Sequence, residues 1–360
     1  MSKDAIMAIE EFGTALDWQA RHAEENNAPC TARVIRALAK VRKGDTATGR
    51  RIAGWQGLTL KDAMPLRIAG GLHFLLLSGK DDRLERVYSG QITDQEQIDR
   101  LVCDMVERFD AILLPWLDGP PQTNEAGRSA SIMSGILWLA QRVNPRFELF
   151  ELGASAGVNT MLERYHFQLG DTAVGPPASP MRIAPEWRGK GAPPSAPENF
   201  GIVSIKGCDV APIDLSDPSA ALRLKSYVWP DAPQRMARID AAIALASERP
   251  PNLTKLDAGE FVARQLALPQ FEGVTRAMIH SIMWQYMPAD TQSSITAAFE
   301  AAGANATRAK PLAWIALETD PATFRHELKV RYWNGEDGDG QSHLLCHAHP
   351  HGAWVDWNGR

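Results

Sequence analysis

The residues best suited to chemistry in this 360-residue chain surround a glycine-rich turn at residues 153–157. A short apolar run at 147–152 precedes the turn and has the composition of a buried strand. Apolar side chains then recur at helical spacing from Val158 to Tyr165, so the local pattern predicts strand, turn and helix. Glycines let the backbone approach a ligand closely, and a helix start presents free N–H groups. The turn is therefore predicted to bind a ligand at the carboxyl end of a strand.

Two known motifs share this turn. It resembles the first motif of class I S-adenosylmethionine-dependent methyltransferases, acid-x-Gly-x-Gly-x-Gly, with Glu151 as the acid and Ser155 replacing the middle glycine. It also spells G-x-S-x-G, the nucleophile elbow of α/β-hydrolases. Glu151 favours the first motif, because the resemblance implies contact between this acid and the amino-acid end of the cofactor. An ordinary turn without a ligand is the third interpretation. The methyltransferase resemblance implies S-adenosylmethionine as cofactor on Glu151, Gly153, Ala154, Ser155, Gly157 and Asn159.

The order of predicted elements defines the fold class. Helical spacing of apolar residues dominates the chain to about residue 143. Strand patterns then alternate with helical ones, after a Pro- and Gly-rich insertion at about 166–200, and the tail has a hairpin pattern. We expect an α/β fold, with a Rossmann-like, methyltransferase-type sheet at 144–360 that is mostly parallel with a C-terminal antiparallel hairpin. An all-α N-terminal region at 1–143 precedes it. This order disfavours a hydrolase, in which several strands come before the elbow.

Several segments together resemble an uncharacterised bacterial family, domain of unknown function 2332. They are QTNEAGRSA at 122–130, ELGASAGVN at 151–159, GCDVAPIDL at 207–215, YVWPD at 227–231, HSIMWQY at 280–286 and the closing HPHGAWVDW. The resemblance covers nearly the whole chain and brings no established activity with it. It implies a methyltransferase-like Rossmann fold with a helical N-terminal part.

Acids at strand ends are candidates for the rest of the cofactor. Asp209 is expected to hold the two ribose hydroxyls, with Asp171 as the alternative, because one carboxylate can accept both hydrogen bonds. Asp257 and Ala258 follow the next strand, where the fold places contacts to adenine. Both aspartates have a structural alternative, since Asp209 could cap a loop and Asp257 could cap a helix.

The end of the fourth strand is expected to carry the transfer chemistry. Amino-methylating enzymes have an Asn/Asp-Pro-Pro-aromatic tetrad there, whereas this chain has HSIMWQY, which disfavours methylation of a base nitrogen. His280 could act as general base, and Trp284 and Tyr286 could surround the sulfonium methyl by cation–π contact. The alternative is a hydrogen-bonded core histidine among core aromatics.

Two further polar sets have side chains that suit a binding site. Asn124, Glu125 and Arg128 stand at the mouth of a helix just before the glycine turn, where an arginine fork could clamp an acidic acceptor. Glu125 and Arg128 could equally form only a surface pair.

His347, His349 and His351 alternate along a predicted strand, but Pro350 interrupts it, so no metal is predicted. In a hydrolase, one of them would be the base, with Asp209, Asp257 or Glu318 as its partner.

Composition limits the remaining classes. A net charge of −5 provides no basic footprint for nucleic acid. The apolar run at 66–77 is too short to span a bilayer, and the N-terminus has no signal-peptide pattern. Four scattered cysteines suggest a reduced, cytoplasmic protein.

The expected function is methyl transfer to a small molecule, with the acceptor and the oligomeric state open. The alternatives are a serine hydrolase using Ser155 and a non-catalytic protein that binds a nucleotide-like ligand or a partner.

Overall fold

Two compact units divide the residues that the computed structural model describes, which are 8–336 and 340–359. One unit comprises the chain to Thr123 together with Asp217–Asp240, and the other comprises Asn124–Ser216 and the chain from Ala241 onward. The boundary predicted at residue 143 thus differs from the observed division in two places. The helix that follows Arg128 belongs to the unit of the sheet, and a segment from the second half of the chain joins the helical unit.

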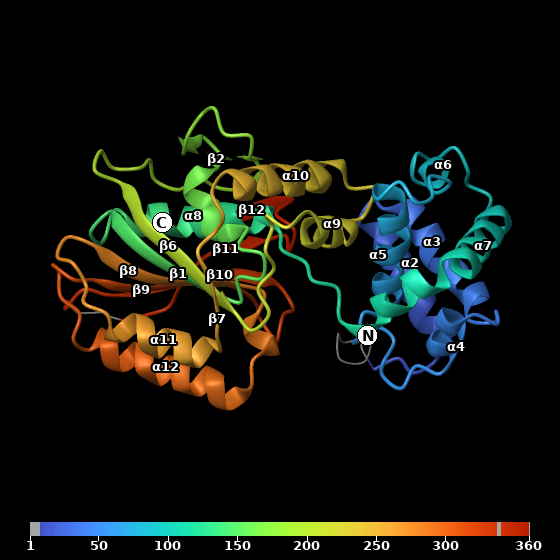
Figure 1. Ribbon diagram of the computed structural model, residues 1–360. Coiled ribbons are helices and arrows are strands. Elements are labelled where there is room, and N and C mark those ends of the chain that lie inside the picture. The colour runs from blue at the N-terminus through green and yellow to red at the C-terminus, as the bar shows by residue number, and fades with distance from the viewer. Residues whose placement is uncertain (1–7, 337–339, 360) are drawn as a thin grey trace. The chain divides into compact units, whose positions relative to one another are not determined.

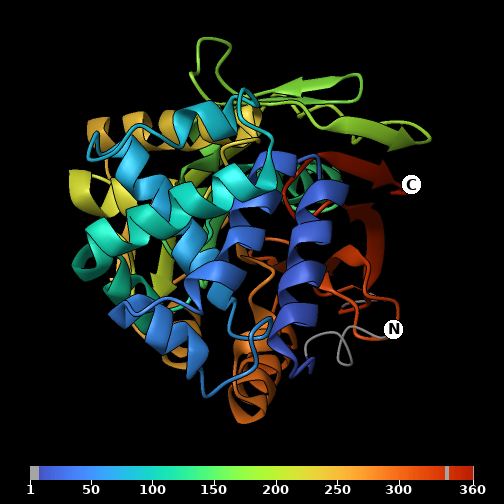
Figure 2. The same cartoon turned by 90° about the vertical axis from the view of Figure 1, so that its right-hand side faces the viewer.

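The first unit is helical, as the sequence predicts (Figure 2). Its helices begin at residues that favour helix starts: Pro29 and Pro65 lie in first turns, and the Asp94 side chain accepts from Gln97 N. The helical spacing of apolar residues predicted from the sequence begins at Ile6, which lies outside the described residues. The helices are α2 (Phe12–Glu25), α3 (Pro29–Val41), α4 (Ala47–Ala53), α5 (Met64–Leu77), α6 (Glu85–Tyr88), α7 (Gln95–Leu113), η1 (Leu114–Asp118), α9 (Pro218–Ser226) and the start of α10 (Pro233–Glu248).

Helix α9 completes the helical unit by packing on α5. A Cβ on Gly70 would lie 2.7 Å from a ring carbon of Tyr227, so the glycine permits this close approach. The buried ring of His73 lies 3.1 Å from the carbonyl oxygen of Ser226. These contacts join residues about 150 positions apart in the chain, which is why sequence periodicity did not predict them.

The second unit contains a nine-stranded, mostly parallel mixed sheet among the described residues (Figure 1). Its order is β5-β12-β11-β10-β9-β8-β1-β6-β7, and the five strands from β7 to β9 are parallel. The strands are β1 (Arg146–Leu152), β5 (Glu186–Gly189), β6 (Gly201–Asp209), β7 (Leu253–Lys255), β8 (Thr275–Ser281), β9 (Leu312–Thr319), β10 (His326–Trp333), β11 (His343–Ala348) and β12 (Trp354–Trp357). This confirms an α/β fold with a helical N-terminal region.

Helices cover both faces of the central strands (Figure 1). α11 (Ala258–Ala267) and α12 (Ala289–Gly303) pack on one face, where Phe150, Phe261 and Phe299 meet in the core. The entirely buried α8 (Ser129–Leu139) lies against β9, β10 and β11 on the other. All seven residues of β8 are buried, as expected of a parallel strand covered on both sides. Because α8 is entirely buried against the sheet, it belongs to the unit of the sheet.

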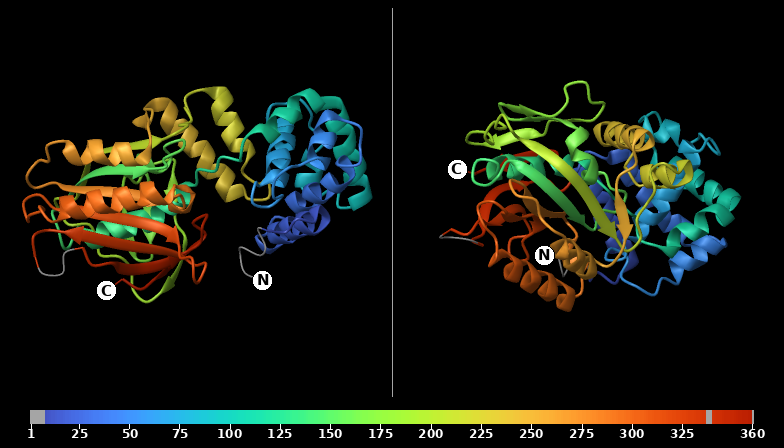
Figure 3. Two further views of the ribbon diagram at one scale, coloured as in Figure 1. Left: turned by 90° about the horizontal axis from the view of Figure 1, so that it is seen from below. Right: turned by 60° about the vertical axis from the view of Figure 1, so that its left-hand side comes forward.

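The remaining strands refine the sequence prediction. The predicted C-terminal hairpin is β10 and β11 (Figure 3). β12 pairs antiparallel with the outer side of β11. The predicted insertion forms a small sheet of β2 (His166–Leu169), β3 (Thr172–Val174) and β4 (Arg182–Ile183), and β5 then pairs with β12. No helix in the described ranges is both long enough and apolar enough to span a lipid bilayer.

Candidate functional site

The glycine turn follows β1, at the point where the strand order of the sheet reverses. β1 lies between β6 and β8, and the chain passes from β1 toward β6 and β7 before it returns to β8. Open α/β sheets bind ligands outside the carboxyl ends of their strands at such a point. Gly153, Ser155 and Gly157 all have left-handed backbone conformations, with φ of 62°, 53° and 72°. Ser155 is therefore strained, because its Cβ costs about 1–2 kcal/mol in that conformation.

The backbone donors of the turn are largely taken by the protein itself. Ala154 N donates to Cys208 O at 2.9 Å, Ser155 N to Asp209 Oδ2 at 2.9 Å, and Val158 N to Asn124 Oδ1 at 2.8 Å. The helix predicted to begin here is only the 3₁₀ helix η3, Asn159–Arg164. The expectation of free N–H groups at a helix start is thus corrected: these donors already have acceptors, so they do not form an anion cradle.

Beneath the turn lie two buried acceptors without donors. Glu151 and Asn159 are each 2% exposed, and Asn159 Nδ2 donates to Glu151 Oε1 at 3.2 Å. Glu151 Oε2 and Asn159 Oδ1 have no hydrogen-bond partner among the described residues. Burial raises the pKa of Glu151 to about 8, against the lowering effects of the Asn159 hydrogen bond and the Arg128 charge. Buried side-chain oxygens without a hydrogen-bond partner are rare in folded proteins.

Three carboxylates gather at this edge of the sheet. Glu151 is the last but one residue of β1, Asp209 ends β6 and Asp257 follows β7. Burial raises the pKa of the Cys208 thiol to about 12, and the charges of all three acids contribute to the increase. Asp171, the alternative to Asp209, is exposed beside β2 in the small sheet, away from these strand ends.

Both aspartates have structural roles. Asp209 Oδ2 accepts from Ser155 N, and its Oδ1 accepts from Ala211 N at 2.9 Å, so it holds the turn in place. Asp257 caps α11 by accepting from the N–H groups that follow the buried Ala258. Each carboxylate oxygen has two lone pairs, so these bonds leave acceptor capacity for a ligand.

His280 is hydrogen-bonded on both ring nitrogens. Nδ1 lies 2.7 Å from Glu318 Oε1, and Nε2 accepts from Trp314 Nε1 at 2.8 Å. The ring is 2% exposed and stacks on Trp284, with centroids 5.0 Å apart. Proton transfer to Nε2 therefore requires the Trp314 bond to break. Tyr286 is 77% exposed, so the structure does not bring it together with this cluster.

In the polar set before α8, Glu125 and Arg128 are buried and Asn124 is half-buried, and the set contacts the glycine turn and the end of β8. Asn124 Oδ1 accepts from Val158 N, as noted above, and Glu125 Oε1 accepts from Gly127 N at 3.1 Å. Arg128, 8% exposed, donates from Nε to Pro350 O at 2.9 Å and from Nη1 to Ser281 O at 3.4 Å. Glu125 is 5% exposed, so neither residue belongs to a surface pair.

Met283 is a site residue that the sequence did not single out. A Cβ on Gly153 would lie 2.9 Å from Met283 Cε, so this side chain occupies the space that the glycine leaves open. The preceding Ile282 has φ of 50°, a rare conformation for a β-branched residue. The backbone of Met283 is held by Glu318, whose Oε1 accepts from Met283 N at 3.2 Å. No local sequence pattern marks this contact, because it joins the ends of two strands.

The late histidines do not form a metal site in the described part of the chain, where no group of three or more candidate ligands occurs. His347 Nδ1 lies 3.9 Å from Glu327 Oε1, and the rings of His349 and His351 are 5.7 Å apart. Ser155 makes no hydrogen bond to a histidine within the same residues. The arrangement of a serine hydrolase is therefore not assembled in this conformation.

Fold and site together define an α/β protein with a polar, partly unsatisfied site at the carboxyl ends of its central strands. Residues 14–357 match the family described as "Uncharacterized protein conserved in bacteria (DUF2332)". The chain belongs to this family. Neither curated proteins nor solved structures gave a match.

Proposed function

We propose that the protein transfers a methyl group from S-adenosylmethionine to a small-molecule acceptor. The observation that carries the proposal is the pair of unsatisfied buried acceptors, Glu151 Oε2 and Asn159 Oδ1, beneath a glycine turn at the strand-order reversal. The amino-acid end of the cofactor has an ammonium group, which donates three hydrogen bonds and is attracted to a carboxylate. In this proposal the ammonium supplies the missing donors.

The order of the strands supports a Rossmann-like, methyltransferase-type arrangement. Numbered along the chain, the parallel strands β7-β6-β1-β8-β9 have the order 3-2-1-4-5, as in doubly wound nucleotide-binding sheets. Asp209 at the second strand then accepts from the ribose hydroxyls, and Asp257 after the third accepts from the adenine amino group. Gly153 allows the cofactor to approach the backbone once Met283 moves aside, whereas the space beside Gly157 is filled by Pro251 and Thr160.

The chemistry proposed for the site is an in-line displacement. Held by Glu151 and Asn159, S-adenosylmethionine would supply an electrophilic methyl group to the acceptor, with the sulfur keeping the electron pair of the broken bond and the acceptor's proton passing to solvent. The protein positions the two reactants and excludes water. His280 orients Trp284 by stacking, which presents an indole face toward the electron-poor methyl group. Arg128 and Glu125 are proposed to orient the acceptor.

Calorimetric titration with S-adenosylmethionine and S-adenosylhomocysteine tests the proposal. Gly153→Ala should abolish binding, because the methyl group enters the space proposed for the cofactor. Gly273→Ala is the matched control: Gly273 has φ of 74°, so the backbone strain is similar, but nothing lies within 4 Å of its Cβ position. If wild-type protein binds neither compound, or if both variants bind equally, the proposal is wrong.

A serine hydrolase is the second candidate, supported by the left-handed Ser155 backbone, a feature of strained nucleophile elbows. A fluorophosphonate probe should label Ser155 if it is a nucleophile, and Ser155→Ala should then remove labelling. A methyltransferase should retain cofactor binding in the same variant. Cofactor binding without turnover of any acceptor would instead support the non-catalytic alternative.

A further inference from the structure

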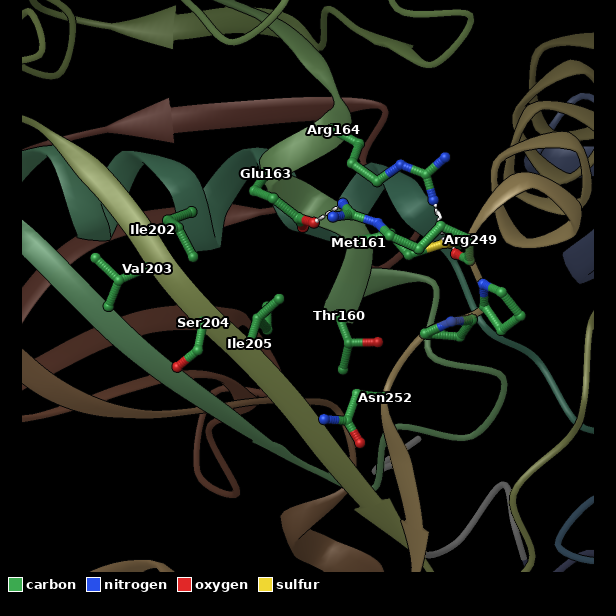
Figure 4. Close-up of a pocket in the computed structure, with 12 residues that line it drawn as sticks. Thr160, Met161, Glu163, Arg164, Ile202, Val203, Ser204, Ile205, Arg249 and Asn252 are labelled. Atoms are coloured by element: carbon green, nitrogen blue, oxygen red, sulfur yellow. Dashed lines mark hydrogen bonds and ion pairs between the residues drawn. The ribbon is translucent and has the colours of Figure 1, made fainter. Parts of the chain in front are cut away.

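A pocket of about 290 Å³ lies beside the glycine turn, on the part of β6 that precedes Gly207 (Figure 4). Its walls come from η3, β6 and the loop before β7. The turn and the pocket share one wall: Thr160 Oγ1 donates to Gly157 O at 2.7 Å, and a Cβ on Gly157 would lie 2.7 Å from Pro251. Pockets that bind small molecules usually measure about 300–1,000 Å³, so this one suits a small ligand.

A register shift in β6 gives the pocket an apolar side. Phe147 of β1 pairs with Ile202 and Glu148 pairs with Ser204, so Val203 is an extra residue without a partner on β1. Since side chains alternate along a strand, one extra residue brings Ile202 and Ile205 to the same side. Figure 4 shows both side chains on the side of β6 where Glu163 and Arg249 lie.

The opposite wall carries one anion and one cation with unused bonding capacity. Arg249 Nη2 lies 2.6 Å from Glu163 Oε1, and Glu163 Oε2 is buried without a partner among the described residues. Arg249 is 66% exposed, and in the described chain its guanidinium group bonds only to Glu163. Arg164 differs, because its guanidinium group donates to Leu245 O, Arg249 O and Glu248.

We propose that this pocket binds a free α-amino acid with an apolar side chain. Its ammonium group donates to Glu163 Oε2, its carboxylate accepts from the unused N–H groups of Arg249, and its side chain lies on Ile202 and Ile205. On binding, the Arg249 side chain moves away from Glu163 far enough to admit the ligand and keeps its contact with the ligand's carboxylate. An adjacent anion and cation complement a zwitterion, whereas a ligand with a single charge satisfies only one of them.

Calorimetry on the full chain with L-leucine, L-isoleucine, L-valine, L-methionine and L-phenylalanine tests this binding. At least one is expected to bind with Kd on the order of 1 mM or tighter. For L-leucine, the analogues L-leucinamide and 4-methylpentanoate each lack one charge and should bind at least about tenfold more weakly. If none of the five amino acids binds, or if the analogues bind as tightly as leucine, the proposal is overturned.

Variants assign the binding to the pocket. Glu163→Gln and Arg249→Gln should each weaken amino-acid binding about tenfold or more. Glu260→Gln and Arg264→Gln, at an exposed ion pair on α11, are the matched controls and should leave the affinity unchanged. Circular dichroism verifies folding, and Arg249→Gln is the safer variant because that side chain is largely exposed. Unchanged affinity in both pocket variants would overturn the assignment, and retained S-adenosylmethionine binding would separate this site from the glycine turn.

Discussion

Glu151 is a buried acid that the fold holds in its protonated form at neutral pH, since its pKa is raised to about 8 by burial. Between the unfolded value of 4.5 and about 8, the folded chain therefore binds one more proton than the unfolded chain. Stability must fall as pH rises through this window, by about 1.4 kcal/mol per pH unit from this group alone.

Glu151→Gln should remove this pH dependence. The amide stays neutral, so the variant is expected to gain stability relative to wild type from pH 5 to pH 8, by about 1–4 kcal/mol. Urea unfolding at both pH values measures the difference. Glu272→Gln, at an exposed loop position, is the control and should follow wild type throughout. If the free energy of unfolding changes with pH equally in wild type and Glu151→Gln, the raised pKa of Glu151 is contradicted.

The same group predicts a proton release on cofactor binding. An ammonium group placed beside Glu151 Oε2 favours the carboxylate, so its pKa should fall and up to one proton should leave near pH 7. Titrations with S-adenosylmethionine in buffers of different ionisation enthalpy count the protons released. Glu151→Gln should release none. Equal proton counts in the two proteins would place the ammonium elsewhere.

At the scale of elements, the connection from β8 to the 3₁₀ helix η4 (Trp284–Tyr286) controls the space over the glycine turn. Ile282 adopts a costly left-handed conformation there, and Met283 lies over Gly153. Backbone strain of this kind concentrates at sites where a segment has to be held in one position or moved. This connection is therefore the element expected to rearrange when a ligand reaches Glu151.

Met283→Ala should tighten S-adenosylmethionine binding, because it removes the side chain that the cofactor must otherwise displace. The expected gain is about three- to tenfold in Kd, together with a loss of about 1–3 kcal/mol in stability from the lost packing. Met287→Ala is the matched control, since Met287 packs against the same core cluster without contacting Gly153. Weaker binding in Met283→Ala alone would show that the methionine supports the ligand.

For the whole molecule, the helical unit is built from two separate stretches of chain. A fragment of residues 1–123 lacks α9, so the face of α5 that Tyr227 covers becomes exposed. We expect this fragment to be poorly folded by circular dichroism and near-ultraviolet signals. A peptide of residues 217–240 added in trans should restore its helicity and raise its melting temperature. A fragment that melts cooperatively without the peptide, with no response to it, would contradict this division.

The sequence alone predicted what local spacing determines. The period of apolar residues located α2, α3, α5 and α7 of the first unit and strands β6 to β9, but not the short helices α4 and α6. Glycine and acid positions marked Glu151, Asp209 and Asp257 as strand-end residues. These features depend on neighbours a few positions away, and repeating side-chain patterns record them. The same spacing predicted an α-helix after the glycine turn, where the structure has the short η3, because apolar spacing alone does not distinguish the two.

Tertiary structure decided the rest, because the relevant contacts join distant residues. Asp209 accepts a hydrogen bond from Ser155 N, 54 positions away in the chain, and Met283 fills the space over Gly153. The register between β1 and β6 brings Ile202 and Ile205 to one side of the strand. The spacing of apolar residues likewise predicted that α8 and α9 are helices. It did not predict that α8 belongs to the unit of the sheet and α9 to the helical unit. Such outcomes follow from which surfaces meet and which polar groups find partners, and these are properties of the folded chain rather than of any single segment.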